Sequence, residues 1–66
     1  MIQVWVNDKQ LLVTADITLT ALLEKEGLLT PIATVAVNGR LLPRREWSYS
    51  LRDGDRVEVV SMMAGG

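Results

Sequence analysis

The chain has 66 residues, of which 48% are hydrophobic and 23% are charged, and its formal net charge is -1. This composition is that of an ordinary folded domain, and the length leaves room for one small hydrophobic core. The basic residues are spread along the chain apart from Arg44-Arg45, which argues against binding to nucleic acid. The chain contains neither Cys nor His, which excludes disulfides and thiolate sites and argues against structural zinc and His-based catalysis.

The chain opens without a positively charged leader, and no apolar run approaches the roughly 20 residues that span a bilayer. We therefore expect a cytoplasmic protein that does not insert into a membrane. A domain of this size buries only about 60% of the surface of its unfolded chain, which leaves little room for a deep substrate pocket. Catalysis inside the domain is disfavoured.

The first 13 residues predict a β-hairpin. Apolar and other residues alternate over Ile2 to Val6, as in a half-buried strand that turns Ile2, Val4 and Val6 to one face. Asn7-Asp8 suits a tight turn whose central residues need a positive φ, and Leu11-Leu12-Val13 is the predicted return strand.

A short helix is predicted over Leu19 to Glu26. Thr18 is the expected N-cap, and Ile17 is placed to pack on Leu22 as a hydrophobic staple. Gly27 stands where a left-handed C-terminal cap is expected. Leu28-Leu29 is then expected to fold back beneath the helix, before the connector Thr30-Pro31.

A second hairpin follows. Ile32 to Val37 is rich in β-forming residues, Asn38-Gly39 is a strong hairpin signal, and Arg40-Leu41-Leu42 begins the next strand. The segment from Arg44 to Trp47 predicts a turn or a single helical turn, with Trp47 filling a gap in the core.

The last predicted strand covers Arg56 to Ser61, after a turn at Asp53-Gly54-Asp55. The two aspartates are interpreted as turn-forming residues rather than catalytic carboxylates or metal ligands. The order hairpin, helix, hairpin, strand predicts an α+β, ubiquitin-like β-grasp fold. One helix packs on one face of a small mixed sheet, in which the first and last strands lie side by side. We expect this domain over residues 1–61 and a flexible tail over residues 62–66.

The tail ends in Ala64-Gly65-Gly66, and glycine places no bulk beside the backbone, so this end can thread a narrow channel. The group it presents is the Gly66 carboxylate, which becomes reactive only after it is joined to a phosphate. Frayed terminal residues are also often rich in glycine, and the last residues taken alone favour that interpretation. If a compact fold delivers this end to a partner, the pattern instead indicates a protein whose C-terminus is activated by another enzyme.

Several stretches together resemble the ThiS family of thiamin-pathway sulfur carriers. They are the Asn38-Gly39 hairpin, the turn from Pro43-Arg44 to Trp47, and Asp53-Gly54-Asp55 at the family's distance from a diglycine end. The resemblance covers nearly the whole chain. One departure is Met62-Met63, where the family has smaller or branched residues.

The resemblance implies a protein co-substrate rather than an enzyme. A ubiquitin-activating-like (ThiF-like) enzyme, which itself uses ATP and Mg, would adenylate Gly66, and sulfur from a persulfide donor would displace AMP to leave a thiocarboxylate. Thiazole synthase (ThiG-like) would consume that sulfur. The chain itself would bind no cofactor and no metal, and it is expected to be a monomer when free.

Partner contacts are predicted at the tail and on one face of the sheet. In the tail we expect partner contacts at Met62, Met63, Ala64 and Gly65. The two methionines are suited to this role because methionine adapts to different surfaces. If Val4, Val57 and Val59 face the helix, Trp5 and Val60 share the opposite face and form an apolar patch.

Three other functions stay open from the residues alone. A carrier for molybdopterin synthesis shares the Gly-Gly end. A ubiquitin-like protein modifier is possible, although Lys9 and Lys25 are the only lysines available for chains. A simple β-grasp interaction module needs no C-terminal chemistry.

Overall fold

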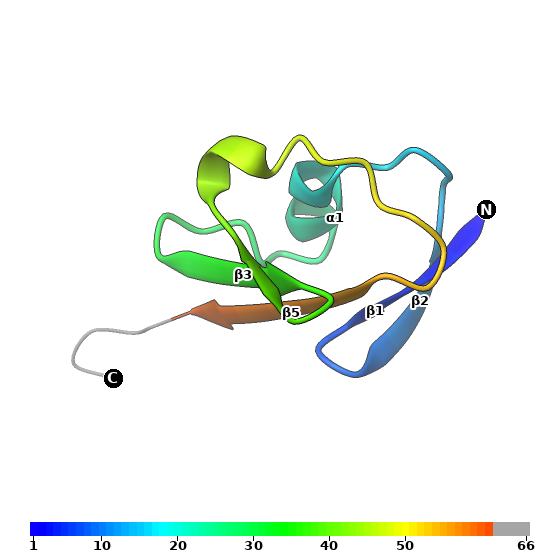
Figure 1. Ribbon diagram of the computed structural model, residues 1–66, viewed down its shortest axis with the longest axis horizontal. Helices are drawn as coiled ribbons and strands as arrows, with labels where there is room; N and C mark the ends of the chain where they lie inside the picture. Colours follow the sequence, from blue (N-terminus) through cyan, green and yellow to red (C-terminus); the bar gives the residue numbers. More distant parts are fainter. Residues whose placement is uncertain (62–66) are drawn as a thin grey trace.

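Five strands form one mixed sheet, and one helix lies across one of its faces in the computed structural model, which describes residues 1–61 (Figure 1). In chain order the elements are β1 (Ile2–Val6), β2 (Lys9–Val13), α1 (Leu19–Lys25), β3 (Ala33–Val37), β4 (Arg40–Leu42), a 3-10 turn η1 (Arg44–Glu46) and β5 (Arg56–Ser61). The strand order is β2-β1-β5-β3-β4, with β5 parallel to β1 and antiparallel to β3. This is the predicted β-grasp arrangement, with the first and last strands adjacent at the centre.

Both hairpins turn through two residues with positive φ. The first turn has Asn7 at φ 48° and Asp8 at φ 70°, and the second has Asn38 at φ 53° and Gly39 at φ 80°. These are the conformations of a type I′ turn, which matches the twist of the flanking strands. Because the first turn takes only two residues, β2 begins at Lys9, opposite Val6, rather than at Leu11.

The residues that flank the helix account for where it begins and ends. The Thr18 hydroxyl accepts a hydrogen bond from the Ala21 backbone N–H at 3.1 Å, which caps the N-terminus. The helix ends at Lys25, one residue before the predicted end, and Gly27 follows with φ 72°. Its apolar stripe is completely buried against the sheet and consists of Leu19, Leu22 and Leu23.

Trp47 fills the core at the end of β4, as predicted. Its ring is 4% exposed, and its Nε1–H donates to the Leu42 carbonyl at 2.8 Å. The Arg44 guanidinium lies over the ring, 4.3 Å from its centroid, and also donates to the Thr30 carbonyl. The Arg44 side chain therefore binds to its own domain through the Trp47 ring and the Thr30 carbonyl.

The segment between α1 and β3 differs from the expectation. Ile32 is 48% exposed and lies in a turn closed by a hydrogen bond from the Ala33 N–H to the Thr30 carbonyl. The strand therefore begins at Ala33 and not at Ile32. Leu28 packs against the core, whereas Leu29 is exposed, so only one of the two leucines folds back.

Candidate functional site

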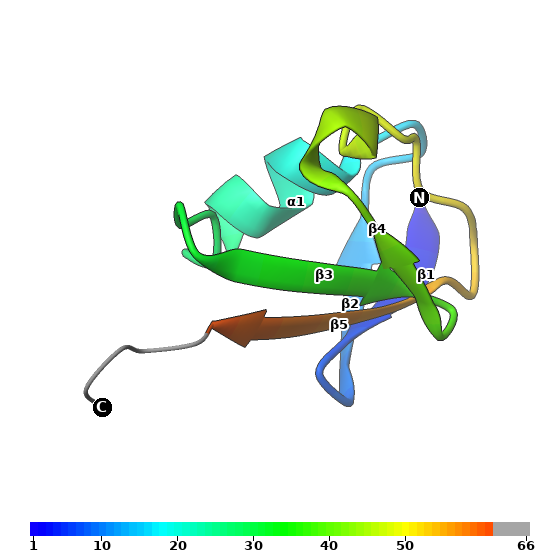
Figure 2. The same cartoon turned by 60° about the vertical axis from the view of Figure 1, so that its left-hand side comes forward.

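The predicted reactive end lies beyond the described residues. Met62, Met63, Ala64, Gly65 and Gly66 all fall within 62–66, so their predicted roles stay predictions. What the structure places is the root from which they continue, at the end of β5, where Ser61 pairs with Ala33 (Figure 2). The tail therefore continues from a central strand. The last residue of this strand, Ser61, has the first residue of β3 beside it.

The face of the sheet opposite α1, the open face, carries Trp5 and Val60 as predicted. Val4, Val6 and Val59 are buried on the helix side, so strand alternation turns Trp5 and Val60 the other way. Val60 is 55% exposed and lies opposite Thr34, one residue before the end of β5. Further exposed apolar side chains on this face belong to Leu12 and Leu41. Val60 thus places apolar surface beside the tail root, whereas Trp5 lies opposite Arg56 at the other end of β5, roughly 13 Å along the strand.

Arg56 is a residue of the open face that the sequence reasoning missed. It lies opposite Trp5 in the parallel pair, and its guanidinium stands 5.1 Å from the centroid of the Trp5 ring. A guanidinium over an indole is held by the electrostatic attraction of the ring face. Alternation along β5 places Arg56 on the same face as Val60, but only the register of β1 with β5 identifies its partner.

A buried carboxylate organises the start of β5, at the opposite end from the tail root. Asp55 is 6% exposed and accepts hydrogen bonds from the Tyr49 hydroxyl at 2.8 Å, the Arg52 N–H at 2.9 Å and the Asn38 amide at 3.0 Å. Burial alone acts to raise the pKa of Asp55, but these bonds and the Arg52 charge outweigh it, and the pKa lies below its usual value. The hydrogen bond to Asp55 in turn raises the pKa of the Tyr49 hydroxyl. Asp55 is thus a turn-forming residue, as predicted, and a buried one.

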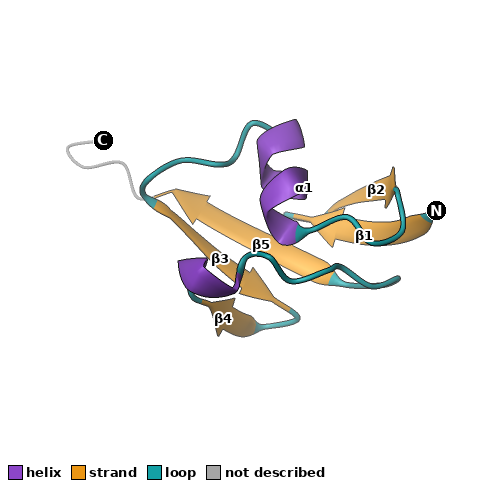
Figure 3. Cartoon of the chain, turned by 90° about the horizontal axis from the view of Figure 1, so that it is seen from above, coloured by secondary structure: helices purple, strands orange, loops and turns teal. Residues whose placement is uncertain are grey.

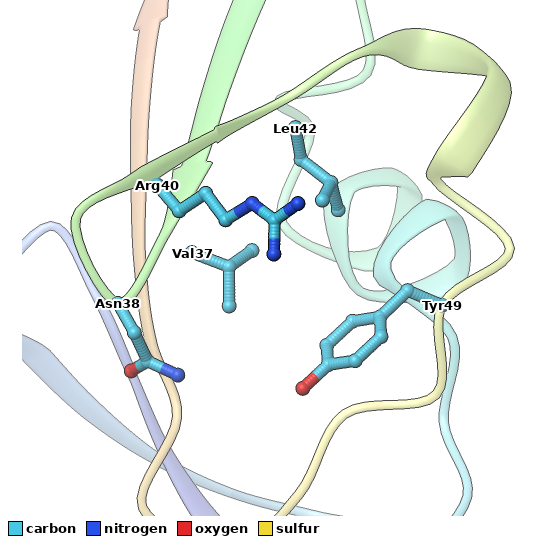
Figure 4. Close-up of a pocket in the computed structure, with 5 residues that line it drawn as sticks. All are labelled: Val37, Asn38, Arg40, Leu42 and Tyr49. Carbon is cyan, nitrogen blue, oxygen red and sulfur yellow. The ribbon is translucent and has the colours of Figure 1, made fainter.

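A shallow cavity of about 270 Å³ adjoins this network and is lined by Val37, Asn38, Arg40, Leu42 and Tyr49 (Figure 4). Two of its polar groups are already engaged, because the Asn38 amide and the Tyr49 hydroxyl both donate to Asp55. The cavity lies beside the first residues of β5, and the six residues of that strand span roughly 20 Å. It is therefore remote from the tail root.

Residues 1–61 contain no group of three or more side chains that could hold a metal ion. Within the same range, no helix has the length and apolar character needed to cross a membrane. The arrangement suits a domain that presents a docking face and a tail.

Comparisons with known proteins agree with this geometry. The model of the ThiS family matches residues 2–66. The sulfur carrier protein ThiS of Escherichia coli (strain K12) is 31% identical over 65 residues, which cover 97% of this chain and 98% of that protein. The crystal structure of the thiamine biosynthesis protein ThiS from Geobacter metallireducens superposes with a TM-score of 0.79 at 32% identity, covering 98% of this chain and all of that one. The chain belongs to the ThiS family.

Proposed function

We propose that this chain is a sulfur carrier of thiamin biosynthesis and that its Gly66 carboxylate carries the sulfur. The observation that carries the proposal is that the family match runs through residue 66 and so includes the Gly65-Gly66 end. The fold supports it, because a stable domain ends in a central strand that continues into this segment. The names of the two relatives, a sulfur carrier and a thiamine biosynthesis protein, favour this pathway over molybdopterin synthesis or protein modification.

The chemistry takes place in partner enzymes. A ThiF-like adenylating enzyme binds ATP and Mg, and the Gly66 carboxylate attacks the α-phosphorus, releasing pyrophosphate. The terminal sulfur of a persulfide then attacks the acyl carbon, and AMP leaves. A thiol cleaves the resulting sulfur–sulfur bond, which leaves a disulfide on the donor and a thiocarboxylate on Gly66. A ThiG-like thiazole synthase takes up this sulfur, an oxygen from water or from the acceptor substrate replaces it on the acyl carbon, and the carrier returns as a carboxylate.

The carrier contributes contact surface rather than catalytic groups. Trp5, beside the start of β5, and Val60, near its end, both lie on the open face, and aromatic side chains such as Trp5 are enriched at binding cores. Met62 and Met63 follow directly along the chain and extend the contact toward the channel that admits Gly65-Gly66. We infer a cytoplasmic carrier that is a monomer when free and whose tail enters two enzymes in turn.

The direct test is the intact mass of the protein after incubation with a ThiF-like enzyme, Mg-ATP and a persulfide donor. The expected result is a gain equal to the replacement of one oxygen by sulfur. Two controls carry the same domain: a variant lacking Gly66 and a variant with one residue appended after Gly66. Neither should gain sulfur. An unchanged mass of the wild-type chain with an enzyme proven active on another carrier refutes the proposal.

A further inference from the structure

Two asparagines bind β5 from opposite sides. Asn7 and Asn38 are each the first residue of a two-residue turn, with φ 48° and φ 53°. Since β5 lies between β1 and β3, the turn of each hairpin reaches one of its two edges (Figure 3). In both cases the asparagine backbone N–H and its side-chain amide form hydrogen bonds to β5 or to the residue that precedes it.

Asn7 extends the pairing between β1 and β5 beyond the end of β1. Its backbone N–H donates to the Val57 carbonyl at 2.9 Å. Its Oδ1 accepts from the Val59 N–H at 2.8 Å, and its Nδ2–H donates to the Val59 carbonyl at 3.3 Å. The side-chain amide therefore takes the place of the peptide group that a longer β1 would supply.

This contact is the last hydrogen bond on the β1 side of β5 before the tail, within residues 1–61. On its other side β5 pairs with β3 as far as Ser61. The strand is thus held along both edges up to Val59 and along one edge at Val60 and Ser61. Asn7 therefore determines how far along β5 hydrogen bonds are made on both edges of the strand.

Asn38 makes the corresponding contacts at the other end of β5. Its backbone N–H donates to the Arg56 carbonyl at 2.7 Å, and its Oδ1 accepts from the Arg56 N–H at 2.9 Å. Its Nδ2–H donates to Asp55. The two asparagines therefore differ chiefly in which end of the strand they hold.

We propose that Asn7 is a positioning residue for the reaction at Gly66, because its amide fixes the strand from which the reactive tail continues. This inference rests on the proposed function. A carboxylate reacts only when it is held within reach of the phosphate and in line with it, and the position and direction of the strand that leads to Gly66 set where the carboxylate starts from. Removing the amide leaves Val59, Val60 and Ser61 held by β3 alone.

The experiment compares Asn7→Gly with Asn38→Gly in the full-length chain. Glycine accepts the positive φ of both turns, so each change removes an amide and keeps the turn. Three quantities are measured: the exchange rate of the Val59 amide hydrogen, and kcat and KM for pyrophosphate release with the adenylating enzyme. Asn7→Asp is the second variant, because it retains an acceptor for the Val59 N–H but not the donor to its carbonyl.

In Asn7→Gly we expect the Val59 amide to exchange at least about tenfold faster, because the change removes both side-chain hydrogen bonds at Val59, including the acceptor of its N–H. We expect kcat to fall by about tenfold, which is well inside the range of losses that misplaced reacting groups produce. KM should stay nearly unchanged because the docking face is intact. Asn38→Gly should leave kcat at the wild-type value, and Asn7→Asp should lie between the two.

Equal losses of kcat in Asn7→Gly and Asn38→Gly overturn the inference, since both then act through general destabilisation. An unchanged kcat in Asn7→Gly with faster exchange at Val59 overturns it as well. If Asn7→Gly does not fold, Asn7→Asp decides the question by the same criteria. Failure of the proposed function is a different result, because wild-type protein would then release no pyrophosphate and gain no sulfur.

Discussion

The buried carboxylate of Asp55 provides the sharpest test of the forces that hold β5 in place. Three donors converge on its two oxygens: Oδ2 accepts from the Tyr49 hydroxyl and the Arg52 N–H, and Oδ1 accepts from the Asn38 amide. An asparagine at this position offers only one oxygen. If that oxygen keeps the bonds of Oδ2, its NH2 group meets the Asn38 NH2 group, donor against donor. Asn38 cannot rotate to relieve this, because its own oxygen holds the Arg56 N–H.

Asp55→Asn therefore loses at least one charge-assisted hydrogen bond and leaves a buried donor without an acceptor, which costs about 2–3 kcal/mol of unfolding free energy. For a domain of this size that corresponds to a fall in Tm of about 10 °C or more. The assay is thermal and urea unfolding followed by circular dichroism at pH 7. Tyr49→Phe, which removes one donor, should cost about 1 kcal/mol, and Asp8→Asn, at an exposed turn residue, should be neutral.

The same reasoning fixes the pH dependence. The pKa of Asp55 is lower in the folded protein than its ordinary value of 3.8, so its carboxylate stabilises the fold fully above that value. This stabilisation is lost as the pH falls below 3.8 and through the folded-state pKa. The difference in unfolding free energy between wild type and Asp55→Asn should therefore be full at pH 7 and shrink below pH 3.8. A variant as stable as wild type at pH 7, or a difference that persists unchanged at pH 2, refutes this account.

Three further predictions follow from the packing and the open face. Trp47→Ala should cost about 3–5 kcal/mol in urea unfolding, because it empties a large buried site and removes the bond to Leu42. Gly39→Ala should cost about 1 kcal/mol, and the cost comes from its φ of 80° alone, since no heavy atom lies within 4 Å of the added methyl group. Trp5→Ala should weaken binding to the adenylating enzyme by about tenfold or more in a titration while the domain stays folded; an unchanged affinity would remove Trp5 from the interface.

Local sequence signals predicted the elements of the fold because each has a local physical cause. Asn7-Asp8 and Asn38-Gly39 tolerate positive φ and so specify two-residue hairpins. Thr18 caps the helix through a bond only three residues away. Such features need no knowledge of the partner strands, and the sheet order then follows from the succession of elements.

The contacts that hold the candidate site together join residues far apart in the chain, and the sequence alone does not identify them. Arg56 finds Trp5 only through the register of two parallel strands. Asn7 bonds to Val59, 52 positions further along the chain. The sequence around Asn7 indicates a hairpin turn but not this bond. Ile32 has the composition of a strand, but the bond from Ala33 to the Thr30 carbonyl holds it in a turn. In the first two cases tertiary context determines the outcome, whereas the turn at Ile32 is closed by a local bond.

The position of β5 also bears on how the protein is made. It is the last strand along the chain and the middle strand of the sheet, and it supplies Val57 and Val59 to the core. A nascent chain that has not yet reached Arg56 contains two hairpins with no strand to join them, and isolated hairpins are barely stable in water. Folding must therefore wait until this strand has left the ribosome. Incomplete products remain unfolded and open to proteolysis, so only chains that have reached β5 persist to meet the enzymes.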